Sequence, residues 1–189
     1  MILDVFWIGK RLMHFQTLST KLRKIAEVMK APIFVVQHHI ASSAHYDFRL
    51  EINGVLKSWA VPKGPSMDPD VKRLAIHVDD HAMSYAGFEG VIPKGQYGAG
   101  PVMLWDRGTY ENTMKFSMEE GMEKGELRFR LDGEKLKGGF SLVRMRGGKG
   151  NNWLLIKSRD SEAKKDYNPV ETKTKSVLTG RTMDEIRDE

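Results

Sequence analysis

Residues 45–61 read HYDFRLEINGVLKSWAV, and this stretch decides the fold. On either side of Asn53-Gly54, apolar and polar residues alternate, which is typical of strands that bury one face only. Asn-Gly between two such runs is the strongest short signal for a hairpin with a two-residue turn. That turn sets the register and opposes three pairs: Ile52 and Val55, Phe48 and Trp59, and Arg49 and Ser58. The sequence therefore predicts a hairpin with one aromatic face and one polar face.

The polar face of the first strand carries His45, Asp47 and Arg49 at every second position. Side chains on a strand alternate between its two faces, so these three groups point the same way. Together with His39, which lies upstream, they offer two imidazoles and a carboxylate, a ligand set for a divalent transition metal such as Mn, Fe or Zn. The guanidinium of Arg49 binds no metal, but its planar fork of donors suits phosphate or carboxylate oxygens. We expect a metal site with an anion clamp beside it.

The strand expected at 33–39 supplies His39. Because neighbouring residues on a strand face opposite ways, only one histidine of the pair His38-His39 can enter the site. We place His39 there, with Gln37 on the same face beside the metal, and we expect His38 on the outer face.

A second cluster of polar groups follows further along the chain, with His77, Asp79, His81 and Tyr85. His81 and Tyr85 fall in a predicted loop, and loops on a rigid scaffold commonly deliver site residues. An imidazole can donate hydrogen bonds to a transferring phosphoryl group or protonate its leaving group, because its pKa lies near neutral pH. We expect His77 to be structural. The polar residues that border both clusters are candidates for substrate binding: Gln37, Ser58 and Asp79.

The glycine-rich run at 90–100, GVIPKGQYGAG, lacks the spacing of a dinucleotide-binding or Walker loop. A nest of backbone N–H groups that holds an anion is one interpretation. A tight connection between two strands is the favoured one. Lys63 follows the second strand of the hairpin and is placed to reach the same cavity as Ser58, although by itself it would count as a surface lysine.

The remainder of 33–157 alternates in short runs separated by glycine-bearing turns, as in a meander or barrel. The expected strands are 33–39, 45–52, 55–61, 73–79, 101–105, 109–111, 127–131, 134–137, 140–146 and 153–157. Helical spacing of apolar residues predicts a short helix at 20–30, and a capping-box pattern at 182–185 predicts another. We expect a mainly β fold, a compact antiparallel β-barrel with a central polar cavity and one or two short flanking helices. The expected divisions are an N-terminal arm at 1–31, the barrel domain at 32–160 and a tail at 161–189.

Composition bounds the class of protein. The chain has 189 residues, which suits one domain, and a net charge of +5. The excess is concentrated at 121–159, with ten basic and four acidic residues, which suits either solvated strand faces or a surface for nucleic acid. The absence of cysteine excludes disulfides and thiolate metal sites. The apolar start at 1–8 contains Asp4 and is too short to span a membrane, so we expect a soluble cytoplasmic monomer without a membrane partner.

Five stretches carry a resemblance to a known family. They are FVVQHHIASSAHYDFRLEINGVLKSWAVPKGPSMDP at 34–69, KRLAIHVDDHAMSYAGFEGVIPKGQYGAG at 72–100, VMLWDRGTYE at 102–111, GELRFRLDGEKLKGGFSLVRMR at 125–146 and WLLIKSRD at 153–160. The pattern resembles the 3′-phosphoesterase domain of bacterial DNA ligase D and its free-standing relatives, and the resemblance covers 34–160.

By position, the resemblance implies a manganese site formed by His39, His45 and Asp47, with Zn²⁺ or Co²⁺ as possible substitutes. It also implies residues around or near the scissile phosphate: Arg49, His81, Tyr85, Lys63 and Arg73. Family members act on the 3′ end of the primer strand in a primer-template. They remove a terminal ribonucleoside and then the remaining 3′-phosphate. The resulting 3′-hydroxyl implies a separate ligase or polymerase of DNA end joining as a partner.

Two parts of the chain depart from the family pattern or extend beyond it. Lys10-Arg11-Leu12-Met13 stands where members usually carry a Lys-Arg-Asp-Phe run, whose charged residues contribute to activity. SVLTGRTMDEI at 176–186 resembles sequence that follows this domain in the ligases, and we assign it no role from the sequence.

Two alternatives from other functional classes stay open on the residues alone. A His-x-Asp pair with a distant histidine is also the ligand pattern of a 2-His-1-carboxylate iron oxygenase, in which Arg49 would hold an oxo-acid cosubstrate. A barrel that only binds nucleic acid, through basic strands and exposed aromatic residues, is the other.

Overall fold

The computed structural model describes residues 31–147 and 150–189. Its strands are β1 (Ile33–Ile40), β2 (Ala44–Ile52), β3 (Val55–Val61), β4 (Lys72–Ala82), β5 (Gly90–Ile92), β6 (Gly100–Asn112), β7 (Glu126–Gly133), β8 (Lys137–Arg144) and β9 (Asn152–Lys157). Its helices are the 3-10 helix η1 (Met83–Gly87) and the α-helices α2 (Met118–Lys124), α3 (Pro169–Thr172) and α4 (Met183–Arg187). The helix expected at 20–30 and the divergent start around Arg11 lie outside the described residues.

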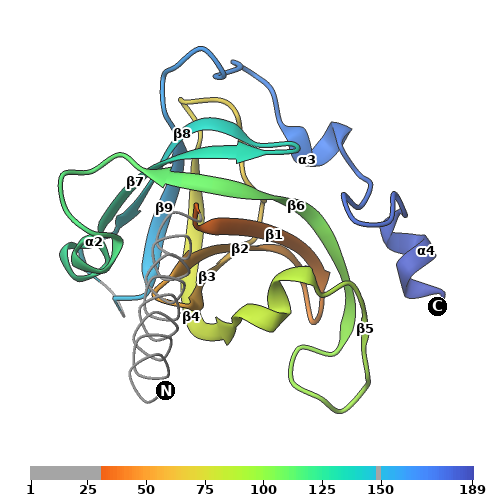
Figure 1. Ribbon diagram of the computed structural model, residues 1–189. Helices are drawn as coiled ribbons and strands as arrows, with labels where there is room; N and C mark the ends of the chain where they lie inside the picture. The colour runs from red at the N-terminus through yellow and green to blue at the C-terminus, as the bar shows by residue number, and fades with distance from the viewer. Residues whose placement is uncertain (1–30, 148–149) are drawn as a thin grey trace, which may run out of the picture. The chain divides into compact units, whose positions relative to one another are not determined.

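The strands form one antiparallel sheet that closes on itself (Figure 1). Neighbouring strands follow the order β1-β2-β3-β4-β9-β8-β7-β6, and β6 pairs with β1 to complete an eight-stranded barrel. The short strand β5 continues the sheet beyond β6. The expected fold class, a mainly β antiparallel barrel with a few short helices, is confirmed. No helix in 31–147 or 150–189 combines the length and the apolar character needed to cross a membrane.

The hairpin of β2 and β3 has the register that its turn predicts. Asn53 and Gly54 both have positive φ, 53° and 76°, as a tight two-residue turn requires. The opposed pairs are the expected ones: Ile52 and Val55, Phe48 and Trp59, and Arg49 and Ser58. The hairpin therefore separates an aromatic face from a polar face.

The aromatic face points into the barrel. Phe48 on β2 stacks on Phe129 of β7, across the barrel, with ring centroids 5.9 Å apart, and Trp59 meets Trp153 edge-on at 5.8 Å. All four side chains are at most 2 % exposed. The centre of the barrel is thus an apolar core held by burial of large rings.

The position of the polar cavity corrects the expectation of a central one. Gln37, His39 and Asp47 lie on the opposite face of their strands from this core, on the outside of the barrel. His38, expected on the outer face, instead stacks on Tyr46, which packs against the core, with centroids 4.3 Å apart. The reason is that the large aromatic residues fill the interior, which leaves the outer surface for a polar site.

Two strand predictions were wrong. The segments expected as a hairpin at 101–105 and 109–111 form the single strand β6, because Asp106 is buried and Gly108 does not adopt a positive φ. At Gly108 a Cβ atom would lie 2.1 Å from the carbonyl oxygen of Asp132, so this glycine allows close strand pairing rather than a turn. The strand expected at 134–137 does not form. Residues 134–136 connect β7, which ends at Gly133, to β8, which begins at Lys137.

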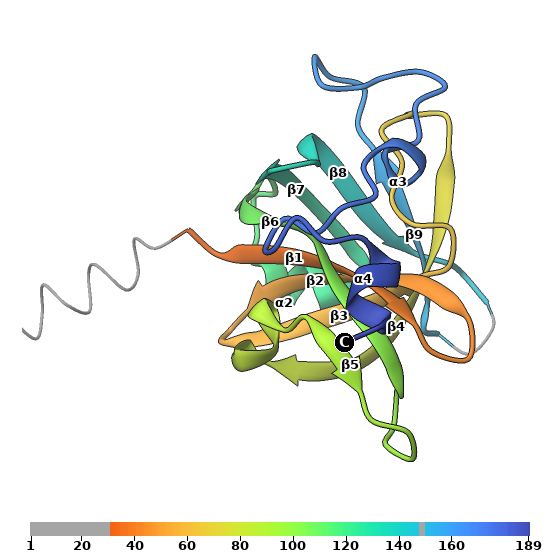
Figure 2. The same cartoon turned by 90° about the vertical axis from the view of Figure 1, so that its right-hand side faces the viewer.

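The capping box expected near the end is confirmed. Thr182 accepts a hydrogen bond from the N–H of Glu185, whose side chain accepts one from the N–H of Thr182. The helix it starts, α4, buries Met183 and Ile186 and lies against β6 and β5 (Figure 2).

Candidate metal centre and catalytic site

A cavity of about 670 Å³ lies on the outer face of β1, β2 and β4, beside η1 and the connection between β5 and β6. Its volume is within the usual range for a small-molecule site. Most of the residues that the sequence singles out line it: His39, His45, Asp47, Arg49, Asp79, His81 and Tyr85. The structure thus brings residues from three strands and one helix to a single place.

His39, His45 and Asp47 form the candidate metal centre. One donor atom from each lies within 4.8 Å of the others. Asp47 Oδ2 is 3.7 Å from His39 Nδ1 and 3.7 Å from His45 Nε2. Ligands that share an ion at about 2.0–2.2 Å stand at roughly this separation from one another. The donor set and its spacing therefore fit a divalent transition metal.

Backbone carbonyls orient both imidazoles toward the shared centre. His39 Nε2 donates to the carbonyl of Gly98 at 2.8 Å, and His45 Nδ1 donates to the carbonyl of Ser43 at 3.0 Å. Because a carbonyl can only accept, the nitrogen that meets the carbonyl carries a proton, and the other nitrogen of each ring, which faces Asp47, is the one that can bind a metal. Outer contacts of this kind fix ring orientation in metal sites.

The environment keeps the carboxyl group of Asp47 ionised. Burial alone would raise its pKa, but the neighbouring imidazoles of His39 and His45 and the charge of Arg49 together hold the pKa below its usual value. The contact with Asp47 in turn raises the pKa of His45. A cation that replaced the proton on His45 would meet a carboxylate that is already charged.

Arg49 is the most firmly held charged group of the site. Its Nε donates to Gln37 Oε1 at 2.8 Å, one terminal nitrogen donates to Ser58 Oγ at 2.7 Å, and the other lies 3.2 Å from Asp47 Oδ2. Arg49 is only 2 % exposed, and burial lowers its pKa. A buried guanidinium with fixed direction is the arrangement that binds a phosphate or carboxylate selectively.

Gln37 ties this guanidinium to the segment that follows β4. Its amide nitrogen donates to the carbonyls of Phe88, at 2.9 Å, and Tyr85, at 3.2 Å. Both polar atoms of the Gln37 side chain thus have hydrogen-bond partners within the protein, and the side chain is fully buried. Gln37 therefore links the guanidinium of Arg49 to the backbone of Tyr85 and Phe88, and its expected contact with substrate stays a prediction.

Ser58 is similarly committed to the protein. It is fully buried, donates to the carbonyl of Leu56 and accepts from Arg49. Tyr85, by contrast, remains half-buried at the cavity, with its ring 5.3 Å from the guanidinium carbon of Arg49 and 5.3 Å from the ring of His81.

A β-bulge brings His81 into the site. Across the β3–β4 pair Ser58 opposes Val78, whereas Leu56 opposes His81, so the stretch of β4 between them has one residue more than that of β3. The extra residue changes the alternation, and Val78 and His81 consequently face the same cavity. The strand expected at 73–79 left His81 to a loop, whereas β4 continues through His81 to Ala82.

His77 packs on the other face of β4, 5.3 Å from the ring of Trp59, as expected of a structural histidine. His81 Nδ1 donates to the carbonyl of Asp79 at 3.0 Å, which leaves Nε2 as the free nitrogen. Burial, and next the charge of Arg49, lowers the pKa of His81. The imidazole is therefore neutral at neutral pH.

Lys63 and Arg73 do not line the cavity. Lys63 is exposed in the turn after β3. Arg73 pairs with Leu155, a core residue, so its side chain starts from the inner face of β4. Neither residue is therefore at the cavity wall, and the expectation that both lie near the scissile phosphate stays a prediction.

The site also uses groups that the sequence analysis did not single out. These are the backbone carbonyls of Ser43, Asp79 and Gly98, and the side chains of Val78, Ile92 and Tyr97 at the cavity wall. Backbone groups carry no residue-type signal. The glycine-rich run at 90–100 was the available hint, because Gly98 has a positive φ of 74° where its carbonyl meets His39.

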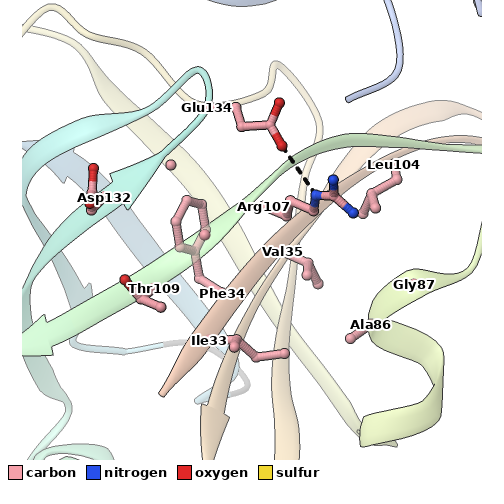
Figure 3. Close-up of a pocket in the computed structure, with 12 residues that line it drawn as sticks. Ile33, Phe34, Val35, Ala86, Gly87, Leu104, Arg107, Thr109, Asp132 and Glu134 are labelled. Atoms are coloured by element: carbon pink, nitrogen blue, oxygen red, sulfur yellow. Dashed lines mark hydrogen bonds and ion pairs between the residues drawn. The ribbon is translucent and has the colours of Figure 1, made fainter. Parts of the chain in front are cut away.

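A second pocket, of about 540 Å³, lies on the outer face of β1 and β6, beyond η1 (Figure 3). Ile33, Val35 and Ala86 line it, and an ion pair of 3.1 Å between Arg107 and Glu134 crosses its rim. It lacks the donor set of a metal site. Within the described residues, the one group of three His, Asp or Glu side chains close enough to share an ion belongs to the first cavity.

Comparisons with known proteins match the part of the chain that carries this cavity. A family model of the DNA ligase D 3′-phosphoesterase domain matches residues 37–144, which include the metal-binding candidates and the groups around them. The chain is 52% identical over 153 residues to the multifunctional non-homologous end joining protein LigD of Pseudomonas aeruginosa. It is 46% identical over 134 residues to the multifunctional non-homologous end joining DNA repair protein LigD of Mycobacterium tuberculosis.

These matches cover 79% and 71% of this chain but only 18% and 17% of the two relatives, so the chain spans less than a fifth of their length. The similarity is thus to one domain of larger proteins, the domain that the family model describes. By that match, which extends over more than half of its residues, the chain belongs to the DNA ligase D 3′-phosphoesterase domain family.

Proposed function

We propose that this protein is a metal-dependent DNA 3′-end-healing phosphoesterase. It removes a 3′-terminal ribonucleoside and a 3′-phosphate from primer-template ends and leaves a 3′-hydroxyl for repair by end joining. The observation that carries the proposal is the contact between the donor set of His39, His45 and Asp47 and the buried guanidinium of Arg49. A metal ion at this donor set and the guanidinium of Arg49 beside it would both bind the negatively charged oxygens of a phosphoryl group.

The metal would be held by His39 Nδ1, His45 Nε2 and Asp47 Oδ2. We propose Mn²⁺, for which Zn²⁺ or Co²⁺ could substitute at the same donors. When bound, such an ion polarises phosphoryl oxygens and lowers the pKa of a coordinated water.

Arg49 supplies the second positive charge. Gln37 and Ser58 hold its guanidinium in place before substrate arrives, so little reorganisation is needed as charge develops on the non-bridging oxygens. Because the group is nearly dry, its interaction with a phosphate is stronger than on an exposed surface.

His81 and Tyr85 act on the substrate from beside Arg49. His81 is neutral and its Nε2 is free, so it accepts a proton from the attacking water and later passes it to solvent, while the leaving oxygen, on the far side of the in-line displacement, takes its proton from a solvent water. The hydroxyl group of Tyr85 donates a hydrogen bond to the phosphoryl group. Asp79 holds His81 through its backbone carbonyl and borders the mouth of the cavity.

The rest of the nucleic acid lies outside this cavity. We propose that Lys63 and Arg73 contact backbone phosphates away from the scissile one, and that the basic segment at 121–159 binds the flanking duplex. The relatives are named as proteins of non-homologous end joining, and we propose that a separate ligase or polymerase of that repair uses the 3′-hydroxyl.

The donor set also favours one rival, a 2-His-1-carboxylate iron oxygenase. The two functions differ in their requirements, since the oxygenase consumes oxygen and an oxo-acid. Release of phosphate from a 3′-phosphorylated oligonucleotide without oxygen would exclude it.

The test uses a 5′-labelled primer-template that ends in one 3′-ribonucleotide, incubated with Mn²⁺ or with a chelator. We expect shortening to a 3′-hydroxyl product with the metal only, and a loss of about 10²-fold or more in rate for His81→Ala. His39→Ala should abolish metal binding and activity. The matched control is His38→Ala, which removes a histidine one position away on the opposite face of β1. Equal product with metal and with chelator would refute the proposal.

A further inference from the structure

Glu89 lies between η1 and β5 and is a buried acceptor for the C-terminal part of the chain. Its side chain is 1 % exposed. The groups that donate to its carboxylate are the backbone N–H of Leu104, the hydroxyls of Ser176 and Thr179, and the guanidinium of Arg181. Burial would raise the pKa of Glu89, but these hydrogen bonds lower it below its usual value. A charged carboxylate therefore anchors residues 176–181, which we term the C-terminal latch.

The latch fills a gap in the sheet. On β6, pairing with β5 ends at Val102 and pairing with β7 begins at Gly108, so in the described residues that edge has no strand between these positions. There the N–H of Leu104 donates to Glu89, and its carbonyl accepts from the N–H of Val177 at 2.9 Å. Buried backbone groups need such partners, and the latch supplies them.

The gap lies next to Gln37, the residue that contacts Arg49 in the candidate site. Leu104 opposes Gln37 across the β1–β6 pair, next to a register shift between Val36 and Gln37. Glu89 follows Phe88, whose carbonyl accepts from the amide of Gln37 at 2.9 Å. The latch therefore reaches Gln37 by two routes, one through Leu104 and one through Glu89 and Phe88. Gln37 is the residue that contacts Arg49.

We infer that the C-terminal latch positions Arg49 for catalysis, with Arg181 and Glu89 acting through Gln37 as positioning residues. The contacts run from Arg181 to Glu89, from Glu89 through Phe88 to Gln37, and from Gln37 to Arg49. This inference rests on the proposed function for its activity readout, but the geometry it concerns is independent of the reaction. It gives a role to SVLTGR at 176–181, which lies outside the residues that the family model matches.

The C-terminal helix holds the latch in place. Residue Thr182 caps α4 directly after the latch, and Ile186 is fully buried where α4 lies against β6 and β5 (Figure 2). The latch is thus fixed at one end by this helix and at its centre by Glu89.

The test compares Arg181→Ala with Arg187→Ala in the full chain. Arg181 donates to Glu89, whereas Arg187 forms an exposed ion pair with Asp184 on α4 and has no hydrogen bond to Glu89. We expect Arg181→Ala to lower kcat for 3′-phosphate removal by about tenfold, with KM changed much less. Arg187→Ala should leave both unchanged, and Arg181→Lys, which keeps a positive charge, should restore part of the loss.

Two further measurements separate positioning from a purely structural role. In a Gln37→Ala background, Arg181→Ala should cause no additional loss, because both changes interrupt the same series of contacts. The NMR resonance of the Arg49 Nε–H group should shift in Arg181→Ala and in Thr179→Val, but not in Arg187→Ala. Additive losses, or an unchanged resonance, would overturn the inference. If the wild type has no phosphoesterase activity, the proposed function fails, and the resonance still decides on the latch.

Discussion

At the scale of single residues, Arg49 shows how much depends on the shape of a charged group. Three of its nitrogens meet three different partners: Gln37, Ser58 and Asp47. A lysine keeps the charge but has one ammonium group, which cannot match this fork. It would leave the buried Gln37 and Ser58 with unsatisfied oxygens. We expect Arg49→Lys to lower kcat/KM for 3′-phosphate removal by about 10²- to 10³-fold in steady-state assays on a 3′-phosphorylated oligonucleotide.

The control for Arg49→Lys is Arg107→Lys. Arg107 is exposed, pairs with Glu134 and lines the second pocket rather than the cavity of the site, so the substitution should leave kcat/KM unchanged. Binding of Mn²⁺, measured by calorimetry, should persist in both variants because neither removes a ligand. Wild-type activity in Arg49→Lys would mean that charge alone is sufficient and that the fork has no role.

Alternation along one strand is enough to group His45, Asp47 and Arg49, and the structure has all three at one cavity. At β4 the expected strand ended at Asp79 and His81 was assigned to a loop, whereas the strand runs on to Ala82 with a bulge that brings His81 to the cavity. A β-bulge depends on how two strands pair, so the residues of β4 alone do not predict it. Prediction from sequence therefore works for residues that share one regular strand and is weaker for groups that tertiary pairing brings together.

At the scale of elements, the β2–β3 turn is a test of backbone conformation. Gly54 has a φ of 76°, and a Cβ atom added there would meet nothing within 4 Å. Any cost of Gly54→Ala is therefore conformational, and we expect a loss of roughly 1–2 kcal/mol in the free energy of unfolding, measured by urea denaturation.

Gly87 provides the comparison for that turn. It also has open space around its Cα but no positive φ, so Gly87→Ala should be neutral or slightly stabilising. Equal destabilisation by the two substitutions would show that the turn conformation is not what Gly54 contributes.

Other elements show where local signals suffice. The Asn-Gly turn and the capping box at Thr182 were both readable because each is a local hydrogen-bonded motif. Helix α2 was missed although its signals are present, with Ser117 as N-cap and Gly125 at φ 76° as C-cap. Gly108, which falls between the two strands wrongly expected at 101–105 and 109–111, allows close pairing of β6 with β7 and forms no turn.

At the scale of the whole molecule, closure of the barrel is the feature that local patterns cannot supply. Short alternating runs predict an antiparallel sheet, but the pairing of β6 with β1 and the choice of the interior face follow from how large side chains fill a closed space. The site lies on the outside for this reason. Closure also buries a carboxylate on β6, where this strand contacts the turn between β7 and β8.

Asp106 is that carboxylate, and it makes stability depend on pH. It is fully buried, accepts hydrogen bonds from the N–H groups of Lys135 and Leu136, and burial raises its pKa to about 6. A folded-state pKa above the unfolded value near 4 means that the folded protein binds more protons between these limits.

The free energy of unfolding should therefore fall as pH rises from about 4 to about 6, by roughly 2–3 kcal/mol, and stay level above about 7 as far as this group is concerned. The measurement is urea denaturation of wild type and Asp106→Asn across this range, because their difference cancels the other titrating groups. The amide cannot titrate, so the wild type should lose its advantage over the variant, or fall below it, as pH increases. Parallel curves for the two proteins would show that Asp106 keeps an ordinary pKa in the folded barrel, and that its hydrogen bonds to Lys135 and Leu136 offset the cost of burial in full.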